Sequence, residues 1–123
     1  MHPLKFAPAL LALSIAGPLS AQAPTQVIQL ANFRYTPASI HLSAGRPVTL
    51  TFANTANGGH DFTAKEFFAA SRITAGAAPN GKIELKAHET KSITLVPAAG
   101  TYPAHCSHFL HASFGMTGQI VVN

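Results

Sequence analysis

The sequence predicts an all-β sandwich of about seven or eight short strands, and three observations support this fold class. Apolar and polar residues alternate over short runs, most clearly in 47–54, where Val48, Leu50 and Phe52 would share one face. Turn-forming Gly, Pro and Asn residues separate these runs roughly every 8–12 residues. The chain has 123 residues, a length that suits one domain with a single core.

Each predicted strand is a short alternating run that ends at a turn signal, and we expect antiparallel pairs among the strands. The segment that follows residue 64 is different, because it holds helix-forming residues and two phenylalanines, so we expect a short helix or lid over 65–73. In chain order, the predicted strands are residues 26–31, 39–42, 47–54, 82–86, 91–96, 101–106 and 118–122.

The remaining segments are predicted to be turns and loops. Residues 32–37 read as a turn-rich corner that includes Tyr35. The Asn- and Gly-rich segment 54–59 is expected to be a loop that delivers His60. The small residues of 74–81 predict a further loop.

Side chains should alternate between core and solvent along the strand 101–106. Tyr102, Ala104 and Cys106 share one face, which we expect to be buried. Pro103 lies on the other face, and because it has no N–H group it favours an edge position or a bulge.

The N-terminal residues 1–21 are predicted to be a signal peptide that is removed from the mature protein. A weakly positive start precedes an apolar run from Ala7 to Ala16, which is too short to span a bilayer well, and small residues follow. We expect cleavage after Ala21, with Ala23 as the alternative. The mature domain, residues 22–123, would then be periplasmic or secreted, with no membrane span.

Charged residues are few and scattered. Eight Lys and Arg oppose four Asp and Glu, so the formal net charge is +4 at pH 7. No basic run stands out, which argues against nucleic acid as a partner.

The last quarter of the chain holds a metal-binding pattern, Cys-x4-His-x4-Met. Cys106 is the only cysteine, so it is a free thiol, an intermolecular link or a metal ligand. His111 lies between it and Met116, the only methionine besides the initiator. Thiolate, imidazole and thioether together suit a copper ion that cycles between two oxidation states. His60, which follows two glycines, is the best candidate for a further ligand from a neighbouring strand.

These residues resemble those of the cupredoxins, the small type 1 or blue copper proteins. The resemblance covers almost the whole mature chain, and its loop spacing is most like that of rusticyanin. It implies a Greek-key β-sandwich. The matching motifs are Gly59-His60-Asp61-Phe62, Gly100-x-Tyr102-x3-Cys106 and Cys106-x4-His111-x4-Met116-x-Gly118-x-Ile120-Val121-Val122.

The resemblance also implies a role for each residue. His60, Cys106 and His111 would form the trigonal plane around one Cu(I)/Cu(II) ion, with Met116 as the long axial ligand. Asp61 would tie the His60 loop to the Cys106 loop. The protein would transfer single electrons and would not be an enzyme.

One departure from the family pattern concerns His108, because many cupredoxin loops carry Pro-Gly where this chain has Phe109-Leu110. His108 is either an outward surface residue or an additional residue that binds the metal or supports a ligand. If it binds, the protein would handle copper as a chaperone, storage or tolerance factor. The other histidines outside the pattern, namely His41, His88 and His105, are expected to be solvated.

The family further suggests a docking surface around His111, the ligand expected to lie nearest solvent. Such an apolar surface suits brief encounters of a monomer with a redox protein or with a copper donor or acceptor. The residues expected to form it are Phe109, Leu110, Ala112 and Phe114.

Two other chemistries are weaker. Cys106 with a histidine could act as a nucleophile, but no carboxylate or Asn is obviously placed to orient the base. A multicopper oxidase would need further ligand sets and a much longer chain. Zinc is disfavoured by the thioether.

Overall fold

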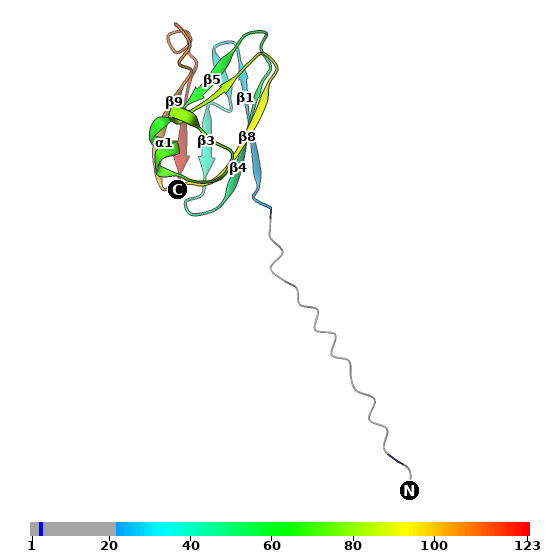
Figure 1. Ribbon diagram of the computed structural model, residues 1–123. Coiled ribbons are helices and arrows are strands. Elements are labelled where there is room, and N and C mark those ends of the chain that lie inside the picture. Colours follow the sequence, from blue (N-terminus) through cyan, green and yellow to red (C-terminus); the bar gives the residue numbers. More distant parts are fainter. Residues whose placement is uncertain (1–2, 4–21) are drawn as a thin grey trace.

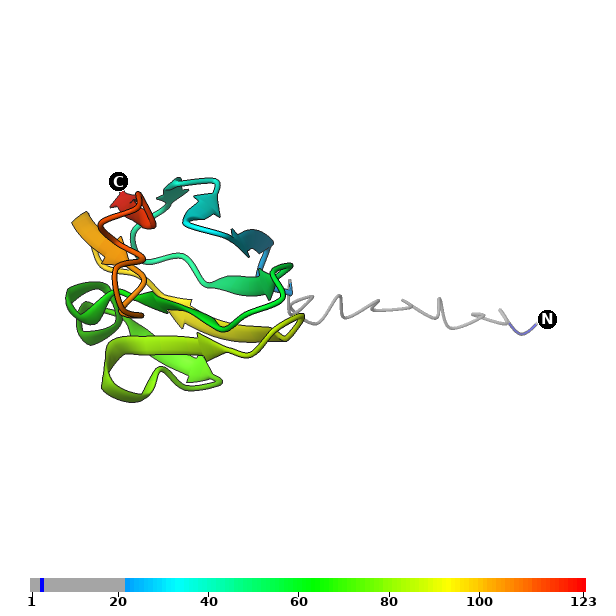
Figure 2. The same ribbon diagram turned by 90° about the horizontal axis from the view of Figure 1, so that it is seen from above.

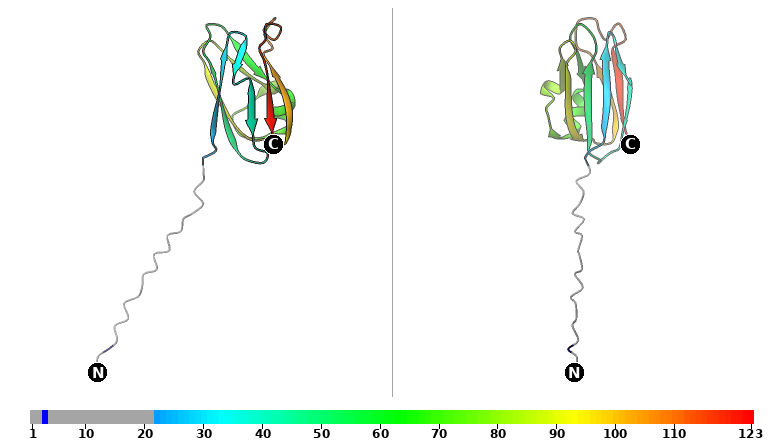
Figure 3. Two further views of the ribbon diagram at one scale, coloured as in Figure 1. Left: turned by 180° about the vertical axis from the view of Figure 1, so that it is seen from behind. Right: turned by 90° about the vertical axis from the view of Figure 1, so that its right-hand side faces the viewer.

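The computed structural model describes Pro3 and residues 22–123. Apart from Pro3, the predicted signal peptide, residues 1–21, lies outside the described residues. Residues 25–122 form a sandwich of two five-stranded sheets (Figures 1 and 3). In the described part of the chain, no helix has the length and apolar character needed to traverse a bilayer.

The two sheets are mixed rather than purely antiparallel. The first contains, from edge to edge, β2 (Arg34–Thr36), β1 (Thr25–Ala31), β4 (Val48–Asn54), β8 (Thr90–Val96) and β6 (Arg72–Ala75). The second contains β3 (Ser39–Leu42), β10 (Thr117–Val122), β9 (Gly100–His105), β5 (His60–Thr63) and β7 (Lys82–Leu85).

Two strand pairs, β1 with β4 and β3 with β10, are parallel. From the sequence, antiparallel pairs are expected. The reason is the path of the chain between the paired strands. After β1 and β2 the chain crosses to the second sheet at β3 and returns at β4, so β4 lies beside β1 without a hairpin between them.

All seven predicted strands are present, and three short strands appear besides them. The predicted corner contains β2, the predicted loop before His60 is followed at once by β5, and β6 overlaps the end of the predicted helix. Alternation could not reveal β5 or β6, because every residue of β5 is buried and every residue of β6 is exposed. The helix itself is shorter than expected.

Helix α1 (Lys65–Ala70) connects the two sheets at one side of the sandwich. It ends where Ser71 Oγ donates to the carbonyl of Phe67, and the chain then continues into β6. α1 contacts both β6 and β9, strands of different sheets (Figures 1 and 2). A 3-10 turn, η1 (Pro79–Gly81), packs against it.

Aromatic side chains fill the space between the sheets. The ring centroids of Phe52 and Phe62 lie 4.8 Å apart, and Tyr35 meets Phe62 edge-on at 5.1 Å. On β9, Ala104 is buried as predicted, and so is Cys106 just beyond the strand. The buried face of β9 therefore leads directly into the loop of residues 107–116, which holds part of the Cys-x4-His-x4-Met pattern.

Pro103 lies on an interior strand rather than at an edge, yet its missing N–H group causes no conflict. Gln119, which faces Pro103 on β10, donates its amide to Ala38, so the amide side of Pro103 points away from β10. On that other side, β5 pairs with β9 only at Thr63 and His105. Pro103 therefore faces no ladder partner.

Candidate metal centre

The predicted ligands come from two places at one end of the sandwich. His60 is the first residue of β5, Cys106 follows β9, and residues 107–116 form a loop at the end away from the C-terminus (Figures 1 and 3). The amide of Cys106 donates to Met116 O at 3.0 Å, and the amide of Met116 donates to His111 O at 3.0 Å. These bonds close the loop on itself.

The departure from the Pro-Gly pattern has a structural consequence at Leu110. This residue adopts φ +63°, a left-handed conformation that is costly for a side chain with a Cβ. A glycine would take this conformation freely. The loop therefore holds local backbone strain at this residue.

Three of the predicted ligands lie together. His60 Nδ1 is 3.1 Å from His111 Nδ1, and His111 Nδ1 is 3.4 Å from Cys106 Sγ. The three ligand atoms all lie within 4.8 Å of one another. We call this group the donor cluster.

The donor cluster has the dimensions of a metal site. Nitrogen and sulfur ligands lie about 2.0–2.3 Å from an ion such as Zn²⁺. In a tetrahedral arrangement these bond lengths place neighbouring ligand atoms roughly 3.3–3.7 Å from one another. The two measured separations are close to that range. Met116, the fourth predicted ligand, is fully buried in the same core, and backbone hydrogen bonds join it to Cys106 and His111. Two imidazoles, a thiol and a thioether fit one copper ion.

His60 is held in the tautomer that binds a metal through Nδ1. Its Nε2 atom donates to Asn32 Oδ1 at 3.3 Å, which leaves the lone pair on Nδ1. The ring is only 2 % exposed, and this burial, together with His111 and His108, lowers the pKa of His60. The imidazole is therefore kept neutral, the form that binds metals.

The thiol of Cys106 is buried next to the amide of Asp61 on β5 and the ring of His111. Burial raises its pKa, even though the amide of Asp61 donates to Sγ at 3.4 Å. Without a cation the sulfur stays protonated at neutral pH. A metal ion would displace this proton, because the thiolate is the binding form.

Asp61 joins β5 to the metal-binding loop. Its carboxylate accepts hydrogen bonds from Ser107 N at 2.9 Å, from Ser107 Oγ and from Thr63 Oγ1 at 2.8 Å. Burial alone would raise the pKa of Asp61, but these bonds and the charge of Lys82 hold it below its usual value. A charged, fully buried carboxylate thus fixes the segment next to Cys106.

His108 lies beside the donor cluster without belonging to it. Its Nε2 atom donates to Glu84 Oε1 at 2.7 Å and lies 3.8 Å from Asp61 Oδ2. The side chain is 31 % exposed. With Asp61 and Cys106 it forms a second group whose ligand atoms lie within 4.8 Å of one another.

The apolar residues of the loop are exposed next to His111. Phe109 is 87 % exposed and Phe114 is 63 % exposed. Phe33, from the corner before β2, meets the His111 ring edge-on with 5.2 Å between centroids. We define the apolar rim as Phe33, Phe109, Leu110 and Phe114; Ala112, also expected there, is half-buried.

Sequence reasoning missed four residues that support the site. Asn32, Phe33 and Glu84 lie at least 24 residues from the side chains they contact, so no local pattern reveals them. Ser107 is adjacent to Cys106, but its bond to Asp61 also spans 46 positions. These residues come into contact only when the chain is folded, so the sequence alone could not pair them.

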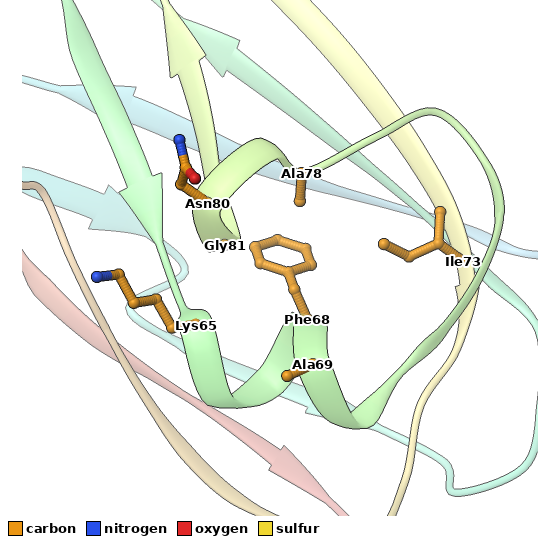
Figure 4. A pocket seen from close by; sticks show the side chains of 7 residues that line it. All are labelled: Lys65, Phe68, Ala69, Ile73, Ala78, Asn80 and Gly81. Carbon is orange, nitrogen blue, oxygen red and sulfur yellow. The ribbon is translucent and has the colours of Figure 1, made fainter.

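A shallow hollow of about 400 Å³ lies elsewhere, between α1, β6 and η1 (Figure 4). Its lining is mostly apolar, and the ring of Phe68 points into it. None of its residues belongs to the donor cluster, and the only charged one is Lys65.

Comparisons with known proteins agree with this geometry. A family model described as a cupredoxin-like domain matches residues 4–122. No curated protein matches the chain.

Several solved structures share the fold. A dithionite-reduced auracyanin from the photosynthetic bacterium Roseiflexus castenholzii is similar with a TM-score of 0.63 and 23% identity, covering 82% of this chain and 98% of that one. Auracyanin B is similar with a TM-score of 0.60 and 23% identity, and the match covers 82% of this chain and 89% of auracyanin B. The multicopper oxidase McoA from the hyperthermophile Aquifex aeolicus gives 0.61 and 13%, covering 84% of this chain but 30% of the oxidase. None of these matches bears on the likeness of the loop spacing to rusticyanin, which stays a prediction.

Proposed function

The chain belongs to the cupredoxin-like domain family, and on that premise we propose that it is a mononuclear copper protein that transfers single electrons. The observation that carries the proposal is the convergence of His60, Cys106 and His111 on a space suited to one ion. Met116 is the fourth proposed ligand. The family match and the set of ligand atoms both support copper as the metal. Electron transfer is our inference from these two observations.

When bound, copper supplies a centre that alternates between Cu(I) and Cu(II). The chain's task is to hold the donors in one arrangement for both states. Asn32 fixes the His60 ring, and Asp61 fixes the backbone beside Cys106. The ligands are also anchored to a packed sandwich, so little movement is expected to accompany a change of charge.

The apolar rim is the proposed route for electrons to and from a partner. His111 is the ligand nearest solvent in this proposal, because His60, Cys106 and Met116 are each at most 2 % exposed. A small apolar surface favours short encounters over stable binding. The partner would be a redox protein or a copper donor or acceptor, and the protein would act as a monomer.

We also propose a periplasmic or secreted location for the mature protein. The support is the leader pattern of residues 1–21 and the use of a single buried cysteine, which a metal would protect from oxidation. We propose no catalytic activity, although the McoA comparison extends to an oxidase. The match covers only 30% of that protein.

Copper handling is the second candidate function, and the position of His108 favours it. The second group, Asp61, Cys106 and His108, could hold copper in a different arrangement from the donor cluster. A protein with two ways to hold the ion would be suited to pass it to an acceptor.

Aerobic titration of the mature protein with Cu(II), followed by visible absorption and EPR, tests the proposal. An intense thiolate-to-copper band with narrow hyperfine splitting and one ion per chain is expected, and Cys106→Ser should abolish it. His105→Gln, an exposed change next to the ligand, is the matched control and should keep the band. Ordinary tetragonal copper spectra in the wild type would instead favour copper handling.

A further inference from the structure

We propose that His108 and Glu84 form an entry site, which takes up a divalent copper ion at the surface and passes it to the donor cluster. This inference rests on the proposed copper site. It assigns a task to two residues that the electron-transfer proposal does not use.

The donor cluster offers little direct access to an ion arriving from solvent. His60, Cys106 and Met116 are almost fully buried, and His111 is half-buried. The open side of His111 is bordered by the apolar rim, whose side chains offer no ligand atoms. A hydrated ion approaching over the rim would meet apolar side chains, which cannot replace its water.

The other flank of the cluster offers ligands at the surface. The side chains of His108 and Glu84 are 31 % and 48 % exposed, and their nearest atoms are 2.7 Å apart. Imidazole and carboxylate are both good ligands for Cu²⁺. Gly59 makes room for this pair, because a Cβ at that position would lie 3.2 Å from His108 Cε1.

The charge at this flank also favours a cation. Asp61 and Glu84 are paired across β5 and β7, so their side chains leave the same face of the sheet. Like charges opposite one another are unfavourable unless a cation lies nearby. Lys82 Nζ is 3.9 Å from Asp61 Oδ2, and it is the only cationic side chain paired with either carboxylate besides His108 among the described residues. An incoming Cu²⁺ would therefore be attracted to this point.

The Cys106 thiol links the entry site to the donor cluster. It belongs both to the group with Asp61 and His108 and to the group with His60 and His111. The ring centroid of His108 lies 5.3 Å from that of His111 and 6.3 Å from that of His60. An ion can thus exchange ligands one at a time around one sulfur. No electron moves in this step, and the thiol releases its proton to solvent.

Stopped-flow mixing of the metal-free protein with Cu²⁺ tests the inference by following growth of the thiolate-to-copper band. In the wild type, the observed rate should level off at high copper concentration, because an entry complex forms before the ion moves. Glu84→Gln and His108→Gln should each slow loading about tenfold or more, because each removes one of the two entry ligands, and losing one residue around a metal site commonly weakens metal affinity by about that factor. The observed loading rates of both variants should also rise linearly with copper concentration, because no entry complex forms first.

Two matched controls separate entry from overall charge and histidine content. Glu89→Gln removes the same charge from the turn before β8, and His88→Gln removes an exposed imidazole whose hydrogen-bond partner among the described residues is Asn57. Both should load like the wild type. If Glu84→Gln and His108→Gln load within twofold of these controls, the inference is wrong while the proposed function stands. A wild type that never develops the band would overturn both.

Discussion

Replacing Asp61 with Asn should destabilise the metal-free protein strongly, because the carboxylate is the main link between β5 and the loop. It accepts three hydrogen bonds within the protein and is fully buried. A hydrogen bond to a charged group contributes about 1.5–3 kcal/mol. Asn keeps one oxygen but loses the charge and the acceptor for Ser107 Oγ, so we expect a loss of about 2–3 kcal/mol.

Thermal unfolding of metal-free wild type and variant measures this loss. For a domain of this size the midpoint should fall roughly 10–20 °C. Glu66→Gln, which makes the same chemical change at an exposed position on α1, should shift it far less. A variant as stable as the wild type would contradict our account of Asp61.

The same comparison at several pH values tests the charge itself. The pKa of Asp61 is lower in the folded protein than in the unfolded chain. Its stabilisation is therefore fully present above the unfolded value, about 3.9, and is lost as the pH falls through the folded value. The difference in unfolding midpoint between wild type and Asp61→Asn should become smaller below about pH 4. A gap that stays constant down to pH 3 would show that shape, not charge, is responsible.

Three further predictions concern the rest of the site. Asn32→Ala should weaken copper binding about tenfold in chelator competition, because the imidazole of His60 loses its hydrogen-bond partner. Asn57→Ala removes the same kind of bond from the exposed His88 and should leave copper binding unchanged. Leu110→Gly should be about 1 kcal/mol more stable than Leu110→Ala by urea unfolding, because only glycine relieves the left-handed strain; equal stabilities would contradict this. Phe109→Ser should slow electron self-exchange measured by NMR line broadening without lowering the unfolding midpoint, and Val27→Ser, an exposed change on β1, should leave self-exchange unaltered.

The strands that the sequence predicts correctly are those with one buried face. Alternation in β4 and β8 reports such a face directly, and their limits differ from the predicted ones by a single residue. β5 has no such pattern because all four of its residues are buried, including His60 and Asp61. Its position depends on β7 and on the loop, which only the folded chain brings together.

The donor cluster could be predicted because Cys106 and His111 lie in one short segment that holds the only cysteine, and because His60 follows two glycines. The residues around it could not. Glu84 has no local signal, since a glutamate on an alternating strand is expected to be solvated, and its contact with His108 spans 24 positions. The left-handed backbone of Leu110 was equally hidden, because leucine rarely adopts it.

Both ends of the folded domain emerge at the pole opposite the metal-binding loop (Figures 1 and 3). The carbonyls of Pro24 and Asn123 accept hydrogen bonds from Thr49 and Ala44, at either side of the turn between β3 and β4. A tether attached to either end would therefore hold the molecule with the donor cluster and residues 107–116 facing away from the point of attachment. Immobilised on an electrode or fused to another protein through this pole, the domain would keep the apolar rim, the proposed docking surface, free.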